Sequence, residues 1–229
     1  MAVVVRRNRK AENIRHPTTN PRMSRRNIPK DVDLSSDTVW PRMTKEQINA
    51  HPMRKYQGPI HVIRRSGQIE QAVSRLEREE VLGFDTETRP TFQVGQSHLP
   101  SVLQLVGEQG AYIFQLRHCR FSRAIRRLLA NPKVVKAGVA LERDVQELTS
   151  LAPFKPAGFV DVGELAKQAG CMNQGLRGLA TVLLGFRVSK KCQTSDWAKA
   201  TLSRAQIEYA ATDAWVGREL YRKLQVLLP

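Results

Sequence analysis

From Ile60 onward, short apolar runs alternate with longer stretches in which apolar residues recur at helical spacing. Such runs are typical of buried strands, and the helical spacing is typical of amphipathic helices. Early strands followed by helices interleaved with another strand indicate an α/β domain with a mixed central β-sheet flanked by helices. We predict strands at 81–87, 102–106, 111–114 and 134–137, and helices from a cap at Ser66 through Leu76 and at 122–130, 141–151, 162–169, 175–184 and 203–227.

Residues 1–58 have a different composition. They contain 13 Lys and Arg against five Asp and Glu, and four prolines precede residue 45. This favours a basic, Pro-containing and largely disordered N-terminal extension, with the folded domain at 59–229. The extension is open to three interpretations: an arm that binds a phosphate backbone, a solvated tail, or an organelle-targeting peptide.

The net charge of +16 suggests a polyanionic partner, and a merely soluble basic protein is the alternative. No apolar run approaches the roughly 18 residues of a membrane span, so no membrane partner is expected.

The three cysteines are far apart and include no CxxC pair. They indicate neither a zinc site nor a disulfide framework, which is consistent with a cytoplasmic location.

Two acids lie close together in the predicted strand 81–87. Because side chains alternate along a strand, Asp85 and Glu87 face one side, while Leu82, Phe84 and Thr86 face the other. Neighbouring carboxylates repel each other, and a hard divalent cation such as Mg²⁺ or Mn²⁺ compensates that repulsion. The pair is therefore a candidate metal site.

Two predicted helices each carry an acid on a face that is otherwise apolar. Positions 141, 144, 148 and 151 share a face on which Asp144 interrupts three leucines. In the last helix, Asp213 follows Tyr209 by four residues on a stripe that continues with Val216 and Leu220. A buried acid is costly unless it is paired, so a salt bridge to Asp144 and a hydrogen bond from Tyr209 are the structural alternatives.

One dinuclear metal site accounts for all of these acids at once. It would join Asp85 and Glu87 from the strand with Asp144 and Asp213 from two helices. Small residues would let the last helix lie close to its neighbours. These are Ala210, Ala211, Ala214 and Gly217.

The same residues resemble a known family. Phe84-Asp85-Thr86-Glu87, then Gly138-Val139 through Asp144, then Tyr209-Ala-Ala-Thr-Asp213 are similar to the motifs of the DEDD exonucleases of the tyrosine subclass (DEDDy). Ribonuclease D and the exonuclease domain of Werner helicase belong to that subclass. The resemblance extends from about Ile60 to Leu228 and includes Leu103-Gln104-Leu105 and Ser195-Asp196-Trp197.

This resemblance implies an RNase H-like exonuclease fold and a metal-dependent 3′–5′ exonuclease. Such an enzyme hydrolyses phosphodiester bonds at the free 3′ end of single-stranded RNA or DNA and releases nucleoside 5′-monophosphates by a two-metal-ion mechanism. Carried over to this chain, Asp85, Glu87 and Asp213 would hold one of two divalent cations, Mg²⁺ or Mn²⁺. Asp85 would bridge to the second, where Asp144 acts directly or through water, and Tyr209 would orient the attacking water.

The chain departs from the family pattern in its middle motif. Many relatives carry an Asn ahead of the Asp of that motif, whereas residues 138–141 here read Gly-Val-Ala-Leu. Substrate contacts are expected from backbone charge and base stacking. The candidates are Thr86, Arg89, Phe92 and His98 near the first strand, and Lys190, Lys191 and Trp197 before the last helix. The alternatives are a core position for Trp197 and an ordinary loop position for His98.

Two other functions remain open at this point. One is a catalytically silent nucleic-acid-binding adaptor on the same fold, and the other is an RNase H-like endonuclease or a polymerase-associated proofreading unit. The presence of all four acids and Tyr209 favours the exonuclease. The choice among RNA, DNA and short oligonucleotides, the preferred metal and the oligomeric state are also open.

Overall fold

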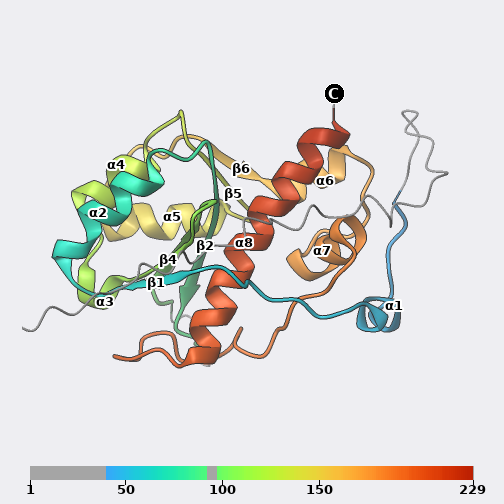
Figure 1. Cartoon of the computed structure of the whole chain (residues 1–229), viewed down its shortest axis with the longest axis horizontal. Coiled ribbons are helices and arrows are strands. Elements are labelled where there is room, and N and C mark those ends of the chain that lie inside the picture. Colours follow the sequence, from blue (N-terminus) through green and yellow to red (C-terminus); the bar gives the residue numbers. More distant parts are fainter. Residues whose placement is uncertain (1–39, 92–96, 229) are drawn as a thin grey trace, which may run out of the picture. The chain divides into compact units, whose positions relative to one another are not determined.

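Six strands form one mixed β-sheet in the order β1-β4-β3-β2-β5-β6 (Figure 1). The computed structural model describes residues 40–91 and 97–228. In the sheet, β3 is antiparallel to both of its neighbours, and the β1–β4, β2–β5 and β5–β6 pairs are parallel. The strands are β1 (Ile60–Ile63), β2 (Val81–Thr88), β3 (Pro100–Val106), β4 (Ala111–Gln115), β5 (Val135–Gly138) and β6 (Phe159–Asp161).

The predicted α/β domain with a mixed sheet is confirmed, and the four predicted strands correspond to β2, β3, β4 and β5 within two residues. The sequence pattern did not predict β1 or β6. These are the two edge strands, four and three residues long, and most of their residues are only half-buried. Strands this short give too few alternations to be recognised by period.

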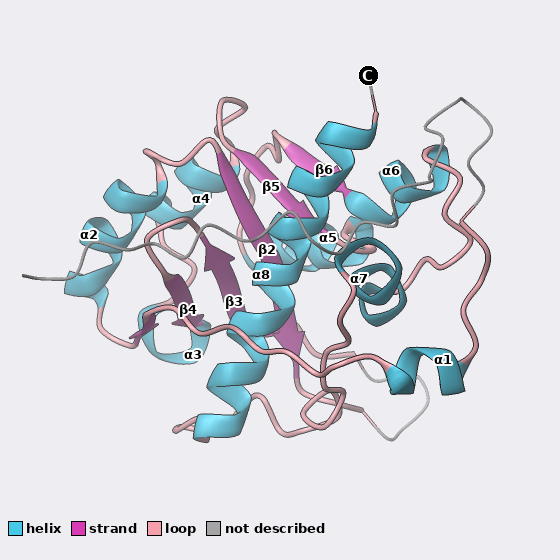
Figure 2. Ribbon diagram, turned by 45° about the vertical axis from the view of Figure 1, so that its right-hand side comes forward, coloured by secondary structure: helices cyan, strands magenta, loops and turns pink. Residues whose placement is uncertain are grey.

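Helices cover both faces of the sheet. One face packs against α2 (Ser66–Leu76), α3 (Leu116–Cys119), α4 (Arg123–Leu129) and α5 (Glu142–Leu151), around a core that includes Phe84, Leu103 and Leu105. The other face packs against α7 (Leu176–Leu184) and α8 (Arg204–Leu227), with α6 (Val162–Gln168) beside them. Figure 2 shows α8 crossing in front of the sheet, and α7 beside it near the short α1 (Lys45–Ala50).

The helix starts are set by local hydrogen bonds. At α8, the predicted capping box is present, because the Gln206 N–H donates to Ser203 Oγ and the Ser203 N–H donates to Gln206 Oε1. At α2, the prediction of Ser66 as the cap is wrong by one residue. Arg65 occupies the N-cap, and its N–H donates to Gln68 Oε1 at 3.1 Å.

Small residues let α8 lie directly on the sheet, as predicted. A Cβ added at Gly83 on β2 would overlap the carbonyl oxygen of Ala214, and one added at Gly217 would lie 2.8 Å from the carbonyl oxygen of Ala137 on β5. The backbones of α8, β2 and β5 are therefore in near contact. This close packing places one side of α8 against the last residues of β2.

Residues 40–58 belong to the predicted disordered extension, yet they have defined structure. The Trp40 N–H donates to the Gly170 carbonyl, and the Arg54 N–H donates to the Arg187 carbonyl, both at 3.0 Å. Between these anchors, Thr44 caps α1. No residue of α1 is buried, and its anchors lie far away in sequence, so neither apolar spacing nor local pattern predicted this order. Residues 1–39 of the extension lie outside the described residues.

Within residues 40–91 and 97–228, no helix combines the length and the apolar character that crossing a membrane requires.

Lys136 on β5 provides a test of the core by pH. Its side chain is completely buried, and its Nζ donates to the carbonyl oxygens of Asn131 and Val134, both at 2.8 Å. Burial lowers the pKa of Lys136 to about 8. Between that value and the ordinary pKa of Lys, the unfolded chain binds more protons than the folded one, so this residue's contribution to stability rises with pH.

We expect the free energy of unfolding of the wild type, relative to that of Lys136→Met, to rise by about 2 kcal/mol between pH 7.5 and pH 10. Urea unfolding of both proteins at the two pH values measures this difference. Because Met does not titrate, the pH effects of all other groups cancel in the comparison. A difference that stays constant with pH would show that Lys136 is fully charged in the fold.

Candidate active site

Three carboxylates meet where β2 passes under α8. Asp85 and Glu87 lie on the same side of β2, as predicted from strand alternation, and Asp213 faces them from α8. One oxygen from each residue lies within 4.8 Å of the other two. Glu87 is 9% exposed and Asp213 is 7% exposed, so the cluster is largely withdrawn from water.

The sheet topology leaves room for this cluster. The pairing of β2 with β5 covers only Val81 to Gly83, whereas its pairing with β3 continues to Thr88. The last residues of β2 therefore have a free edge on the β5 side. Asp85 and Glu87 both lie in that unpaired part of β2.

Asp144 reaches the site from the other face of the sheet. Its helix, α5, packs with Leu141 and Leu148 into the core that contains Phe84. Thr86, whose side chain alternates with those of Asp85 and Glu87, donates its hydroxyl hydrogen to Asp144 Oδ1. The predicted convergence of four acids is therefore found for three, and Asp144 lies beside them without joining the three-oxygen cluster.

In the part of the chain that the structure describes, none of the four carboxylates forms a salt bridge, so the alternative of a salt-bridged Asp144 is wrong. Burial raises the pKa of Asp85 and Glu87, and their repulsion from the neighbouring carboxylates raises both further. Burial also raises the pKa of Asp213 to about 7 and that of Asp144 to about 6.

Bound cations would offset the burial and the mutual repulsion of these carboxylates. Asp213 Oδ1 is buried and has no hydrogen-bond partner among the described residues. An unpaired buried carboxylate oxygen is costly, and carboxylate oxygens are the ligands that Mg²⁺ and Mn²⁺ prefer. The donor set of Asp85, Glu87 and Asp213 therefore fits a divalent cation.

Tyr209 lies one helical turn before Asp213, on the same side of α8. Burial raises the pKa of the Tyr209 phenol, and the nearby carboxylate of Asp213 raises it further. The phenol is therefore protonated and able to donate a hydrogen bond toward the cluster. The Tyr209 ring packs against Trp197, with ring centroids 6.0 Å apart.

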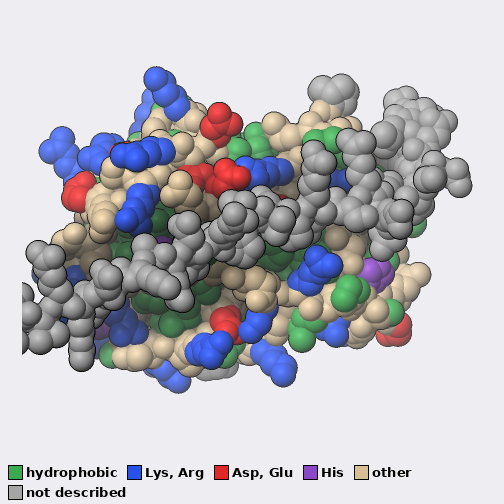
Figure 3. Space-filling model, viewed as in Figure 1, with side chains coloured by type: hydrophobic (Ala, Val, Ile, Leu, Met, Phe, Trp, Pro, Cys, Tyr) green, Lys and Arg blue, Asp and Glu red, His purple; other side chains and the backbone are tan. Residues whose placement is uncertain are grey.

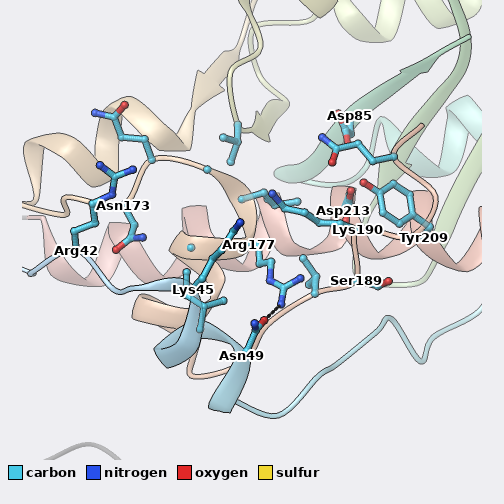
Figure 4. A pocket seen from close by; sticks show the side chains of 18 of the residues that line it. Arg42, Lys45, Asn49, Asp85, Asn173, Arg177, Ser189, Lys190, Tyr209 and Asp213 are labelled. Atoms are coloured by element: carbon cyan, nitrogen blue, oxygen red, sulfur yellow. Dashed lines mark hydrogen bonds between the residues drawn. The ribbon is translucent and has the colours of Figure 1, made fainter. Parts of the chain in front are cut away.

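A cavity of about 900 Å³ opens in front of the carboxylates (Figure 4). Asp85, Thr86, Glu87, Tyr209 and Asp213 line one part of it. The rest of the wall comes from the first turn of α7, the loop that contains Lys190, and the residues around α1. The helix α7 begins after Gly175, which provides no side-chain cap for the first amides.

The predicted substrate contacts have different outcomes. Thr86 and Lys190 line the cavity. Arg89 and Lys191 are exposed and His98 is half-buried, but none of these three lines it. Trp197 is only 1% exposed and packs in the core against α8, so of its two interpretations the structure shows the core residue and not a base-stacking surface. Phe92 lies outside the described residues.

Sequence reasoning assigned no role to Gln104, which lies opposite Asp85 on β3. Gln104 is completely buried, and neither its Oε1 nor its Nε2 has a partner among the described residues. A buried amide next to the carboxylates is able to orient Asp85 or a water at the cluster. The signal was present, because Gln104 is the one polar residue in the apolar run 102–106.

The middle motif, which lacks the Asn of many relatives, contains a residue in an unfavourable backbone conformation. Ala140 adopts a φ of 58°, in the left-handed region that disfavours residues with a Cβ. Its side chain is exposed, so packing does not compensate the cost of this backbone conformation.

We expect Ala140→Asn and Ala140→Gly to raise the free energy of unfolding by about 0.5–1 kcal/mol, measured by urea unfolding. Ala50→Gly, at an exposed helix end, should lower it, and a similar loss at Ala140 would contradict the strain.

Similarity to known proteins identifies the family of this domain. A sequence model of the 3′-5′ exonuclease family matches residues 60–229. The bifunctional 3′-5′ exonuclease/ATP-dependent helicase WRN of Mus musculus is 33% identical over 156 residues, which cover 66% of this chain but 11% of that protein. This chain therefore spans only a small part of that relative.

Solved structures agree on the fold. The Nibbler EXO domain of Aedes aegypti superposes with a TM-score of 0.69 at 22% identity, covering 78% of this chain and 93% of that one. Ribonuclease D of Trypanosoma brucei in complex with RNA U12 superposes with a TM-score of 0.65 at 20% identity, covering 78% and 64%.

The mixed sheet with its covering helices has the RNase H-like fold of the solved exonuclease domains. The chain belongs to the 3′-5′ exonuclease domain family.

Proposed function

We propose that this protein is a metal-dependent 3′–5′ exonuclease of the tyrosine subclass that removes nucleoside 5′-monophosphates from single-stranded nucleic acid. The observation that carries the proposal is the cluster of Asp85, Glu87 and Asp213, whose oxygens lie within 4.8 Å of one another and which forms no salt bridge among the described residues. Membership of the 3′-5′ exonuclease family supports it. The basic charge of the chain supports a polyanionic substrate.

The proposed roles follow from position. Asp85, Glu87 and Asp213 would hold one divalent cation, and Asp144, held by Thr86, would help to hold a second next to Asp85. Mg²⁺ or Mn²⁺ ions bound there would stabilise the negative charge that develops on the scissile phosphate and make water more acidic. Tyr209 would orient the attacking water through its hydroxyl, since it lies beside Asp213 and lines the same cavity.

The polarity of degradation tests this function. Strands labelled at the 5′ end should give a ladder of shortened products, and strands labelled at the 3′ end should release the labelled mononucleotide at once. Both reactions should require Mg²⁺ or Mn²⁺ and stop in EDTA. RNA and DNA strands of the same sequence, compared in parallel, identify the preferred substrate.

The same assay separates the alternatives. A catalytically silent adaptor would bind the strands and leave them intact. An RNase H-like endonuclease would cut a closed circular single strand, which offers no 3′ end. Cleavage of the circle would overturn the exonuclease assignment.

A further inference from the structure

The cavity in front of the carboxylates has a second wall that is basic. It contains Arg42 and Lys45 from the segment that precedes the family region, and Arg177 from α7. We propose that Arg42 and Lys45 bind backbone phosphates of a single-stranded nucleic acid whose 3′ end lies at the carboxylates. This extends the proposed function, on which it rests, to a preference for strands several nucleotides long.

The basic residues of the cavity extend from the carboxylates to the far side. In Figure 4, Lys190 lies beside Asp213 and Tyr209, whereas Arg42 lies on the other side, with Lys45 and Arg177 between them. A volume of about 900 Å³ is near the upper end of ordinary small-molecule sites, which are roughly 300–1,000 Å³. The cavity therefore extends beyond the carboxylates to a region that suits the phosphates of the preceding nucleotides.

The segment that carries Arg42 and Lys45 is attached to this wall. The Met43 N–H, between them in sequence, donates to Oδ1 of the buried Asn173 at 3.0 Å. The guanidinium of Arg177 donates to Asn49 Oδ1 at 2.6 Å, which ties α1 to α7. Because both ends of this short stretch are held, the two cations are kept at the cavity instead of moving freely with a tail.

Neither cation is committed to another role in the fold. Arg42 and Lys45 are exposed, and in the described part of the chain neither forms a salt bridge or a side-chain hydrogen bond. Elsewhere, Lys and Arg side chains are scattered over the face seen in Figure 3, so net charge alone does not mark a binding surface. The position of Arg42 and Lys45 at the wall of the acid-containing cavity marks a binding surface, because exposed cations without an ion-pair partner are suited to bind phosphate oxygens.

Binding of fluorescent oligonucleotides tests this wall. Full-length protein carrying Asp85→Asn, which prevents cleavage, is titrated with an octanucleotide and a dinucleotide, each as RNA and as DNA, at several salt concentrations. The test variant adds Arg42→Ala and Lys45→Ala. The matched control adds Arg75→Ala and Arg78→Ala, which remove the same charge from exposed positions at the end of α2, on the opposite face of the sheet.

We expect the test variant to bind the octanucleotide about tenfold more weakly at 0.1 M salt, and the control to bind it within about twofold of its parent. The slope of log affinity against log salt should fall by about 1.4, because each phosphate contact on a single strand contributes about 0.7. The loss should be at least about fivefold smaller for the dinucleotide, which is too short to reach the wall. RNA and DNA should lose affinity equally, since phosphates are common to both.

The outcomes separate this inference from the proposed function. Equal losses in the test and control variants would mean that only net charge matters, and would overturn the inference. An equal loss for the dinucleotide and the octanucleotide would also overturn it. If unsubstituted protein cleaves no strand but the expected binding pattern is found, the exonuclease proposal fails while the phosphate-binding wall stands.

Discussion

Asp213→Asn is expected to abolish hydrolysis and, at the same time, to stabilise the metal-free protein. The substitution removes the charge of a carboxylate that is buried, lies close to Asp85 and Glu87, and forms no salt bridge among the described residues. Activity should fall about a thousandfold or more, because a ligand that holds the cation is lost. In EDTA at pH 8, the free energy of unfolding should rise by about 1–2 kcal/mol, which corresponds to a Tm increase of roughly 2–8 °C.

The metal response provides the second half of this test. Mn²⁺ should raise the Tm of the wild type by mass action, since the cation binds the folded state. The same addition should leave the Tm of Asp213→Asn nearly unchanged. Glu108→Gln, at an exposed turn, serves as the control and should match the wild type in both activity and metal response. Asp213→Asn with wild-type activity and a full metal-induced shift would remove Asp213 from the site.

Gly83→Ala should damage the same site without touching a carboxylate. Its Cβ would overlap the Ala214 carbonyl oxygen, so α8 would have to move away from β2. Overpacking of backbone against backbone has no flexible side chain to absorb it, and we expect a loss of about 3 kcal/mol of stability. Because Asp213 moves with α8, the Mn²⁺-induced increase in Tm should also decrease.

Gly67→Ala is the matched control for this prediction. Gly67 lies in α2, and a Cβ added there meets nothing within 4 Å. Alanine is the better helix former, so this variant should gain about 0.5–1 kcal/mol. Thermal unfolding of the two variants should therefore move in opposite directions. If Gly83→Ala were as stable as the wild type, the close contact between α8 and β2 would not control the site.

Much of the fold follows from local patterns. The periods that predicted β2 to β5 and the longer helices are visible within single segments, and the capping box at Ser203 fixed the start of α8. By contrast, β1, β6 and α1 are short, and they depend on pairing or hydrogen bonds with residues far along the chain. The pattern of their own residues was therefore not sufficient to predict these three elements.

The candidate site was partly predictable for the same reason. Two acids on one side of a strand, and a single acid on an apolar helix face, are both local anomalies. The pair Asp85 and Glu87, and the single acids Asp144 and Asp213, were therefore recognised from their own segments. Trp197 could not be assigned because an aromatic residue before a helix is equally compatible with a core and with a binding surface, and only its packing distinguishes the two.

The sequence determined which residues carry charge on faces that should be apolar, because strand and helix periods are properties of neighbouring residues. Only the tertiary structure decided that Asp213 lies beside Asp85 and Glu87. It also decided that Asp144 is hydrogen-bonded by Thr86 outside this cluster, and that Arg42 lines the same cavity. Distances between segments depend on how closely backbones pack. Here that packing is set by Gly83 and Ala214, which touch across elements more than a hundred residues apart.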